Sequence, residues 1–247
     1  MNQGSAYKAQ LVLPAYNEPE NLENLINRAV EAAKEFGHDA TTFQLVLVNN
    51  GSTDKTAAVL NRLKKSDLAE WFHVVQIVKN QGYGFGVKMG LRACSAPIIG
   101  WSHADLQCDP KDFFKSVKIA SDESANVLVK GIRRKRALKD QFVTTVFEFL
   151  ARRILGLKTG EINAQPKVFP KSFLPHVING PDTFELDIYT LYQAHKKGYD
   201  IKTIEVDFPP RIHGISKWAH SLMGRYEGIK RMFFYMLQLR NTEGKLQ

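Results

Sequence analysis

An acidic side chain after a short apolar segment is the first feature of this 247-residue chain with a clear chemical use. Asp105 follows Pro97–Trp101, whose composition predicts a buried strand. Hard divalent cations prefer oxygen ligands, and one carboxylate together with substrate phosphate oxygens can hold Mg²⁺ or Mn²⁺. Asp105 could instead cap the helix that begins near Pro110, but Asp109 is better placed for capping. We therefore predict that Asp105 is a metal ligand.

Two groups of basic residues stand where they can bind phosphate. Arg133–Arg136 follow the end of a predicted strand. Arg211, Ser216 and Lys217 share a second, glycine-containing segment. Arginine pairs with phosphate oxygens through two parallel hydrogen bonds, so either group can hold a substrate phosphate. A solvated basic face explains Arg134–Arg136 equally well, whereas phosphate binding is favoured for the second group.

Glu185 and Asp187 are the candidates for a general base. A hydroxyl nucleophile must give up its proton as it attacks, whereas an ionised phosphate needs no base. A spacing of two residues directs side chains to different faces of a helix, so we expect only one of the two carboxylates to reach a reaction centre.

Alternating strands and helices must position these residues. The predicted strands are Lys8–Tyr16, Phe43–Val48, Phe72–Val78, Pro97–Trp101, Asn126–Gly131 and Tyr199–Phe208. The predicted helices run from Pro19 to Gly37, onward from Thr53 as N-cap, and over Val87–Cys94, Phe142–Leu155, Asp182–Lys197 and Trp218–Arg240. This order predicts an α/β fold with a mostly parallel sheet. Right-handed crossovers then bring the polar loops after the first four strands to one edge, where ligands bind.

Composition narrows the function classes. The chain is 44% apolar and 24% charged, as in an ordinary globular domain. No apolar run approaches the ~20 residues of a membrane-spanning helix, and the first residues lack the pattern of a secretory signal. Cys94 and Cys108 fit neither a metal site nor a disulfide framework, so we expect a cytoplasmic protein.

The net charge of +9 favours phosphates, acidic membranes or nucleic acid as partners. No nucleic acid is expected, because the aromatic residues mostly fall at core spacing instead of interleaving with basic ones.

Four motifs occur in the order in which family 2 glycosyltransferases carry them. They are Pro14-Ala15-Tyr16-Asn17-Glu18, Asn50-Gly51-Ser52-Thr53-Asp54, Ala104-Asp105-Leu106-Gln107 and Arg211-Ile212-His213-Gly214-Ile215-Ser216-Lys217. The chain resembles this family over nearly its whole length, and especially the dolichol-phosphate mannose synthase type, which transfers sugars to polyprenyl phosphates. The resemblance implies the GT-A fold, a single Rossmann-like α/β/α sandwich.

The resemblance also assigns roles to individual positions. It implies a nucleotide site that contains Pro14, Tyr16, Glu18, Asn49, Gly82, His103 and Ala104. It implies that Gln107 joins Asp105 at the cation and that Arg133 lies near the acceptor phosphate. The loop of Arg211, Ser216 and Lys217 is implied to close over the donor. Asp187 matches the acidic position of a family pattern, which makes it the favoured base over Glu185. The stretch 163–167 stands where relatives read the acceptor.

Two positions depart from the family pattern. His103 stands where relatives carry an aspartate; an imidazole suits Mn²⁺ or softer ions better than Mg²⁺, or it contacts ribose or phosphate instead. Asn49 and Asn50 replace two aspartates, the first of which accepts an N–H of uracil or guanine in relatives. An asparagine can also donate, and cytosine offers an acceptor there, so a cytidine-nucleotide donor is an open alternative.

The resemblance therefore predicts an inverting glycosyltransferase that acts in cell-surface glycan assembly. A nucleotide sugar is the expected donor, and a lipid phosphate or a saccharide the acceptor. A nucleotidyltransferase is the alternative enzyme, but it would carry a glycine-rich, lysine-containing loop after the first strand. We expect one domain over residues 1–247, with a nucleotide-binding half at 1–110, an acceptor half at 111–217 and a C-terminal helix at 218–247.

The C-terminal helix is apolar nearly all round at Met232–Leu237 and has basic neighbours. It can lie in a membrane interface, pack against the sheet, or form a homodimer contact. The first interpretation places the protein peripherally on the inner face of a membrane, on lipid or beside a membrane-protein partner.

Overall fold

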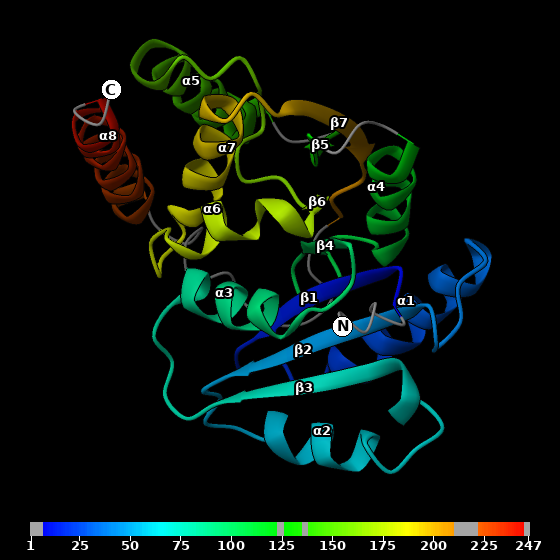
Figure 1. Ribbon diagram of the computed structural model, residues 1–247. Coiled ribbons are helices and arrows are strands. Elements are labelled where there is room, and N and C mark those ends of the chain that lie inside the picture. Colours follow the sequence, from blue (N-terminus) through cyan, green and yellow to red (C-terminus); the bar gives the residue numbers. More distant parts are fainter. Residues whose placement is uncertain (1–6, 123–125, 135–137, 210–221, 245–247) are drawn as a thin grey trace.

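The computed structural model describes residues 7–122, 126–134, 138–209 and 222–244. Within these residues, seven strands form one sheet in the order β3-β2-β1-β4-β6-β5-β7 (Figure 1). Arg211, Ser216 and Lys217, predicted to bind phosphate, lie outside the described residues. The α/β prediction is confirmed.

The first half of the chain supplies four adjacent parallel strands. β1 (Ala9–Ala15) pairs with β2 (Phe43–Asn50) on one side and with β4 (Ile98–Trp101) on the other. β3 (Phe72–Ile77) extends the sheet beyond β2. β1 and β2 are buried on both faces, which is why they read as continuous apolar runs without alternation. All four strands lie where the sequence predicted them.

The other half adds a strand that was not predicted. β6 (Lys167–Pro170) runs antiparallel between β4 and β5 (Val127–Arg133), and β7 (Asp200–Val206) pairs parallel with β5. β6 has only four residues, begins with a lysine that follows Pro166, and ends at Pro170, so its sequence resembles a turn. The sheet is therefore mixed, with one short reversed strand at its centre.

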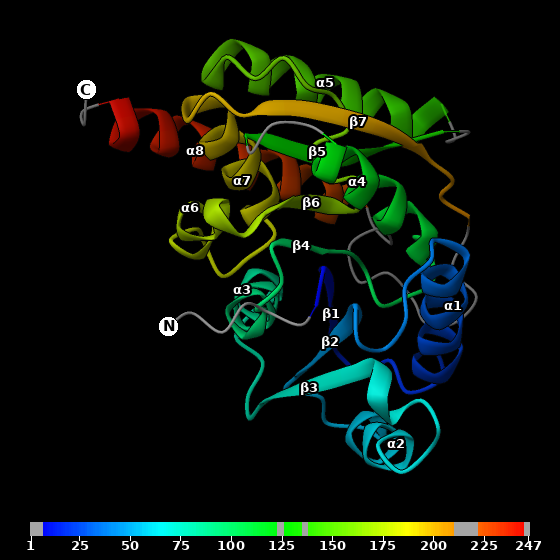
Figure 2. The same ribbon diagram turned by 45° about the vertical axis from the view of Figure 1, so that its right-hand side comes forward.

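Helices cover both faces of the sheet (Figure 2). One face carries α1 (Leu22–Glu35), α2 (Thr56–Leu63) and α4 (Pro110–Asp122). The other carries α3 (Tyr83–Ala93), α5 (Leu138–Leu155), α6 (Leu174–Ile178) and α7 (Leu186–Lys196). Each face has its own apolar core, as a doubly wound α/β fold requires.

Several helix starts differ from those predicted. α5 begins at Leu138 and α7 at Leu186, where Phe142 and Asp182 were expected. α1 begins at Leu22, because Pro19 lies in the preceding turn. The N-cap of α2 is Lys55 and not Thr53, whose backbone N–H binds Asn17 instead. α3 begins at Tyr83, four residues before the predicted Val87. The glycines in this segment hid the start of the helix in the sequence, and the close contacts described below require them.

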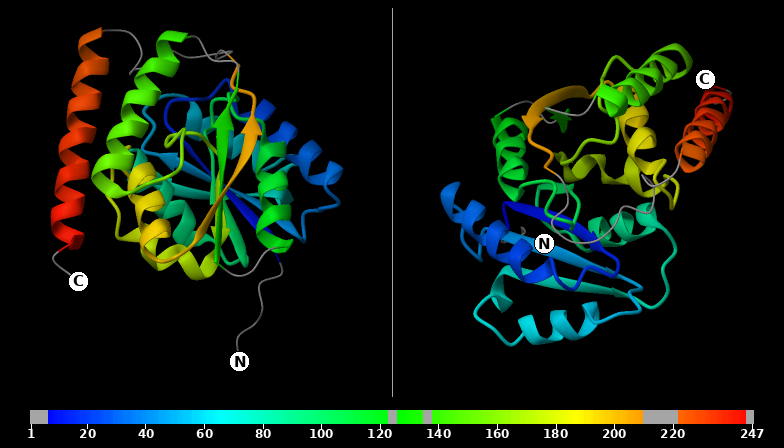
Figure 3. Two further views of the ribbon diagram at one scale, coloured as in Figure 1. Left: turned by 90° about the horizontal axis from the view of Figure 1, so that it is seen from above. Right: turned by 180° about the vertical axis from the view of Figure 1, so that it is seen from behind.

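The C-terminal helix α8 (Leu222–Gly244) lies beside α5 (Figure 3). Its Met232, Met236 and Leu239 are buried in the same core as Phe147 and Ala151 of α5. Packing thus accounts for one face of the helix, while Phe234 on another face is 56% exposed. None of the helices in the described residues has the length and apolarity that crossing a bilayer requires.

Candidate functional site

The loops after β1 and β2 are joined by hydrogen bonds. The backbone N–H of Asn17 donates to Ser52 Oγ at 3.1 Å, and Thr53 N–H donates to Asn17 Oδ1 at 2.9 Å. Glu18 N–H donates to Thr56 Oγ1, and Glu18 Oε2 accepts from Asn21 Nδ2 at 2.6 Å. These bonds hold the Pro14–Glu18 segment, with its partly exposed Tyr16, against the second motif. The predicted nucleotide residues Pro14, Tyr16 and Glu18 are thus fixed at the carboxyl edge of the sheet.

Asn49 and Asn50 end β2 and point to opposite sides of it. Asn49 is fully buried; its Oδ1 accepts from Ser52 N–H at 3.2 Å and its Nδ2 donates to Gln76 Oε1 at 3.1 Å. Asn50 Nδ2 donates to Gly82 O at 3.0 Å. The exposed Gln76 therefore stands between the Asn49 amide and solvent on this side. Whether Asn49 reads a nucleobase stays a prediction.

The glycines at the start of α3 have a packing role. A Cβ on Gly82 would lie 2.3 Å from Asp182 O, and one on Gly84 would lie 2.4 Å from Pro181 O. Gly82 also has a φ of +115°, in the region that favours glycine. The loop before α7 thus lies directly on the α3 N-terminus. The buried Lys88 fastens this contact by binding Gly180 O and Asp182 Oδ1, the latter at 2.7 Å. The predicted role of Gly82 at the nucleotide remains a prediction.

The segment after β4 brings the predicted metal ligands together. Asp105 is 5% exposed, and its Oδ1 accepts from Gln107 N–H at 3.1 Å. Gln107 Nε2 donates to Pro209 O at 2.9 Å, which links this segment to the residues that follow β7. Asp109 Oδ1 accepts from Lys111 N–H, so Asp109 provides the cap of α4 and Asp105 is not needed for it. Ala104 packs into the core beneath.

His103 has an imidazole suited to binding a cation or a ligand. Burial lowers the pKa of His103, while the charges of Asp105 and Asp187 oppose this shift and that of Lys167 reinforces it. The ring is therefore mainly neutral at neutral pH, the form that binds a metal. Within the described residues, no group of three or more His, Cys, Asp or Glu side chains could hold a metal ion. One carboxylate and one imidazole fit a divalent cation whose other ligands come from a substrate.

Asp187, the predicted base, lies in a buried ion pair. Its Oδ1 accepts from Lys167 Nζ at 2.6 Å and from Gln165 Nε2 at 3.0 Å. The side chains of Lys167 and Asp187 are 0% and 4% exposed, and the ammonium also lies 5.6 Å from the ring centre of Trp101. Burial lowers the pKa of Lys167, and Asp187 opposes that shift. Asp187 thus reaches the region of His103, with one oxygen already engaged.

Tyr83 connects this ion pair with His103. Its hydroxyl oxygen accepts from Trp101 Nε1 at 2.9 Å and from Gln165 Nε2 at 3.2 Å. Its ring lies 6.0 Å from the His103 ring and is stacked on Phe184 at 4.8 Å. Burial raises the pKa of Tyr83 well above its usual value, and the charge of Asp187 adds to this effect. The phenol is therefore a neutral group that can donate its proton in a hydrogen bond.

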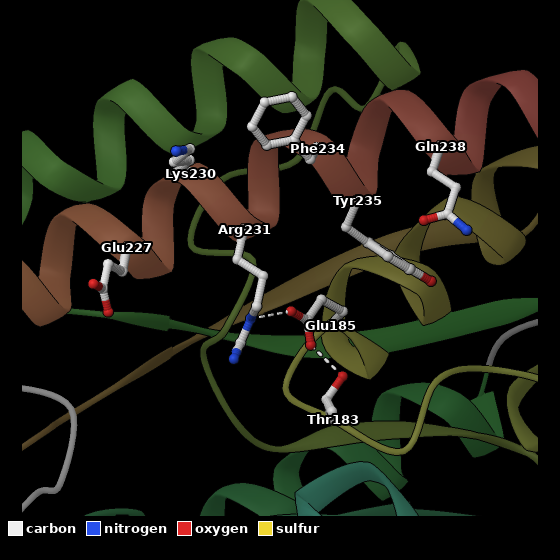
Figure 4. Close-up of a pocket in the computed structure, with 8 residues that line it drawn as sticks. All are labelled: Thr183, Glu185, Glu227, Lys230, Arg231, Phe234, Tyr235 and Gln238. Carbon is white, nitrogen blue, oxygen red and sulfur yellow. Dashed lines mark hydrogen bonds and ion pairs between the residues drawn. The ribbon is translucent and has the colours of Figure 1, made fainter.

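Glu185 faces a different partner from Asp187, as their spacing predicted. Glu185 Oε1 accepts from Arg231 Nε of α8 at 2.5 Å, and Oε2 accepts from Thr183 Oγ1 (Figure 4). These residues line an open pocket of about 470 Å³ between α8 and the start of α7. The carboxylate of Glu185 is thus held at the α8 side, away from the Lys167 pair.

Arg133, predicted to bind the acceptor phosphate, is held at the end of β5. Its Nε donates to Glu161 Oε2 at 2.5 Å, and its guanidinium lies 5.2 Å from the ring centre of Phe208. Only 13% of its side chain is exposed. An incoming phosphate would have to share the guanidinium with Glu161, whose backbone N–H is in turn bound to Glu148.

Lys130 is a buried cation without a carboxylate at hydrogen-bonding distance among the described residues. Its Nζ donates to Gly131 O and Gly160 O, both at 2.7 Å. Burial lowers its pKa to about 7, and the charge of Lys167 acts in the same direction. Lys130 therefore titrates near neutral pH in the folded protein.

This titration should appear in the pH dependence of stability. Between pH 7 and 10.5 the unfolded chain keeps a proton on Lys130 that the folded chain has released. The free energy of unfolding should then rise with pH, relative to Lys130→Met, by up to about 1.4 kcal/mol per pH unit in this window. Urea unfolding at pH 7.5, 8.5 and 9.5 measures the slope. Exposed Lys64→Met should keep the native slope; an unchanged slope in Lys130→Met would contradict the assignment.

The structure brings most of the predicted residues to one edge of the sheet. They are joined there by Tyr83 and Trp101, for which the sequence predicted no role at a site, and by Gln165 and Lys167 of the stretch 163–167, for which it predicted only a part in reading the acceptor. Tyr83, Trp101, Gln165 and Lys167 form a network with the predicted Asp187. The sequence signal for Gln165 and Lys167 was that the stretch 163–167 stands where relatives read the acceptor. Tyr83 was hidden within a glycine-rich segment, and Trp101 was counted only as part of a strand.

Comparison with known proteins shows which proteins this chain is similar to. Residues 10–174 match Glycosyl transferase family 2. A similar protein is the undecaprenyl-phosphate 4-deoxy-4-formamido-L-arabinose transferase of Photorhabdus laumondii, 24% identical over 86% of this chain and 63% of the relative. The protein of the same name from Enterobacter sp. strain 638 is 29% identical over 70% of this chain and 50% of its own length. The chain thus spans between half and two thirds of these curated relatives.

Solved structures with a similar fold include glucosyl-3-phosphoglycerate synthase of Mycobacterium tuberculosis. Its complex with Mn²⁺, UDP-glucose and phosphoglyceric acid has a TM-score of 0.69 at 19% identity, covering 94% of this chain and 79% of that one. Its UDP complex has a TM-score of 0.68 at 21% identity, with the same coverage. At this level of identity the likeness shows the fold, which is that of the GT-A enzymes.

Proposed function

Because the chain belongs to glycosyl transferase family 2, we propose that it transfers a sugar, with inversion, from a nucleotide-activated donor in cell-surface glycan assembly. The observation that carries this proposal is that the loops after four adjacent parallel strands stand at one carboxyl edge of the sheet, and that the loop after β4 contains His103 and Asp105. The first two loops would hold the nucleoside. The third motif would face its diphosphate.

Asp105 and His103, with Gln107, would hold a divalent cation whose remaining ligands are diphosphate oxygens. When bound, such a cation spreads the negative charge that develops on the departing diphosphate. Manganese is the better fit because of the imidazole, and the fold neighbour from M. tuberculosis was solved with Mn²⁺. The protein's own part is to fix the carboxylate through Gln107 N–H and to keep the imidazole neutral.

The hydrogen bonds of Glu185 and Asp187 favour a lipid phosphate as the acceptor. Both oxygens of Glu185 are engaged, by Arg231 and Thr183, and Asp187 Oδ1 is engaged by Lys167 and Gln165. A saccharide hydroxyl would need one of these groups as a base, whereas an ionised phosphate needs none. The names of the curated relatives, both undecaprenyl-phosphate transferases, point to the same acceptor class. Arg133 is the described cation best placed to meet that phosphate.

An assay with several donors tests the proposal. The protein would be incubated with UDP-, GDP- and CDP-sugars, with MnCl₂, MgCl₂ or EDTA, and with or without undecaprenyl phosphate in detergent. We expect nucleotide release that requires the cation and transfer of the sugar to the lipid phosphate. If a saccharide but not the lipid accepts the sugar, the acceptor assignment is wrong. If no donor is consumed with any acceptor or cation, the enzymatic proposal itself is wrong.

The base of the nucleotide is tested by binding. Asn49 orients its oxygen toward Ser52 N–H and its amide nitrogen, a donor, toward the exposed Gln76, so a nucleobase would have to displace Gln76 to reach that nitrogen. Calorimetric titration with UDP, GDP, CDP and CMP should show whether this amide selects an acceptor, as in cytosine. Asn49→Asp should then shift preference from CDP toward UDP. Much tighter binding of UDP or GDP than of CDP and CMP by the native protein would end the cytidine hypothesis.

We further propose that α5 and α8 present a peripheral membrane-binding face. Phe149 is 61% exposed, with exposed Arg152 and Arg153 three and four residues on, and Phe234 is 56% exposed and follows exposed Lys230 by one turn. Aromatic and basic side chains together bind anionic lipid surfaces. The face would lie on the inner leaflet, where a lipid phosphate is within reach.

Sedimentation with vesicles tests this face. Phe149→Ser/Phe234→Ser should reduce binding to vesicles of anionic phospholipid several-fold, because each substitution removes apolar area from the interface. Val78→Ser is the matched control, since Val78 is 97% exposed and lies on another part of the protein. Equal binding by the double variant would reject the assignment. A change of oligomeric state in the double variant would assign the face to a homodimer instead.

A further inference from the structure

The hydrogen bonds around Tyr83 leave its own proton without an acceptor among the described residues. The phenol oxygen accepts from Trp101 Nε1, which can only donate, and from Gln165 Nε2. Both lone pairs of the oxygen are therefore used. The remaining capacity of the hydroxyl is to donate one hydrogen bond. Tyr83 and His103 are both partly exposed residues, so solvent borders this group of side chains.

Gln165 provides a hydrogen-bond acceptor beside this donor. Its Nε2 donates to Tyr83 and to Asp187 Oδ1, while its Oε1 is buried with no hydrogen-bond partner. A flip of the amide would turn Oε1 toward Asp187 Oδ1, which already accepts from Lys167 Nζ at 2.6 Å. Two acceptors would then face each other, so the ion pair fixes the orientation of the amide. A buried acceptor without a hydrogen-bond partner costs free energy, and a ligand that donates a hydrogen bond to it removes this cost.

One donor and one acceptor thus lie next to each other beside His103. Amide oxygen and nitrogen share a carbon, so Gln165 Oε1 adjoins the nitrogen that contacts Tyr83. A hydroxyl is the simple group that both accepts and donates a hydrogen bond. A phosphate oxygen only accepts at neutral pH, and Oε1 would repel it. The exposed ring of Phe184, stacked on Tyr83, offers an aromatic face to the C–H side of a sugar ring.

We propose that Tyr83 and Gln165 recognise one hydroxyl of the sugar being transferred, and so determine which donor sugar is accepted. Tyr83 donates to the sugar oxygen and Gln165 Oε1 accepts the sugar's proton. The Lys167–Asp187 pair acts as a positioning element that sets the Gln165 amide. This inference rests on the proposed function, because it takes the ligand to be a nucleotide-activated sugar.

Deoxy analogues of the donor test the pairing. kcat/KM would be measured for UDP-glucose and its 2-, 3-, 4- and 6-deoxy analogues, or for the corresponding set of whichever donor the enzyme prefers. We expect one deoxy position to lower kcat/KM about tenfold, as the loss of a paired hydrogen bond does. Tyr83→Phe should lower kcat/KM for the parent donor about tenfold and should leave kcat/KM for that deoxy analogue unchanged. Gln165→Met should behave in the same way.

The controls separate recognition from folding. Tyr199→Phe, which removes a hydroxyl outside the site, should keep the native values, and binding of UDP alone should be unchanged in Tyr83→Phe. If Tyr83→Phe and Gln165→Met lose the same factor on every deoxy analogue, the two residues do not read a sugar hydroxyl and the inference is wrong, although the transferase function stands. If the native protein consumes no nucleotide sugar, the proposed function fails first and this inference with it.

Discussion

Asp105→Asn should lower kcat/KM for sugar transfer by about 100- to 1000-fold, the usual effect of removing one group that stabilises developing negative charge. The substitution keeps the size of the side chain, and an asparagine oxygen can still accept from Gln107 N–H as Asp105 Oδ1 does. Only the negative charge that attracts a cation is lost. We therefore expect the free energy of unfolding to change by no more than about 1.5 kcal/mol, the contribution of one hydrogen bond.

The matched control is Asp67→Asn, which removes the same charge from an exposed position. Binding of UDP in the presence of MnCl₂ should weaken in Asp105→Asn and not in Asp67→Asn, and binding in EDTA should be alike in all three proteins. Full activity of Asp105→Asn would show that Asp105 is not a metal ligand.

Lys167→Met should destabilise the protein by about 3–5 kcal/mol, because it leaves the carboxylate of Asp187 buried without its cation. Asp187 is 3% exposed, and Gln165 is the other donor to its Oδ1. The double variant Lys167→Met/Asp187→Leu replaces both charges by apolar groups and should recover much of the loss. Urea unfolding at pH 7.5 gives the free energies for the double-mutant cycle.

The pair of Arg62 and Glu23 provides the comparison. It is equally close, at 2.6 Å, but its side chains are 61% and 46% exposed. Arg62→Gln and Glu23→Gln should each cost less than about 1 kcal/mol. A cost of Lys167→Met in that lower range would mean that the Asp187 carboxyl becomes protonated or hydrated without difficulty, and that the pair does not hold Gln165 in place.

The strands of the first half could be predicted because their residues are buried on both faces. Leu45–Val48, for example, form an uninterrupted apolar run bounded by polar residues, and such a run has few alternatives to a central strand. Local sequence was equally sufficient for the loops that follow these strands. Parallel topology alone brings the Asn17 and Ser52 loops to the same edge.

The second half of the chain could not be predicted in the same way, because long-range contacts determine its structure. β6 is a strand only because β4 and β5 flank it; its four residues carry no pattern of their own. Lys167 reads as a surface residue until Asp187, twenty positions later, is placed against it. The distinct directions of Glu185 and Asp187 followed from helix geometry, but the identity of their partners did not.

The contact between Gly82, Gly84 and the loop 180–183 limits how this fold can be recombined. These glycines and Lys88 belong to the first half of the chain, whereas the backbone they meet leads directly into Glu185 and Asp187. A chimera joined near residue 110 would combine one half with a foreign version of the other. The contact between the halves would be kept only if the protein that supplies the second half has a loop of the same shape at this position. Substitutions in the two halves are therefore constrained to occur together.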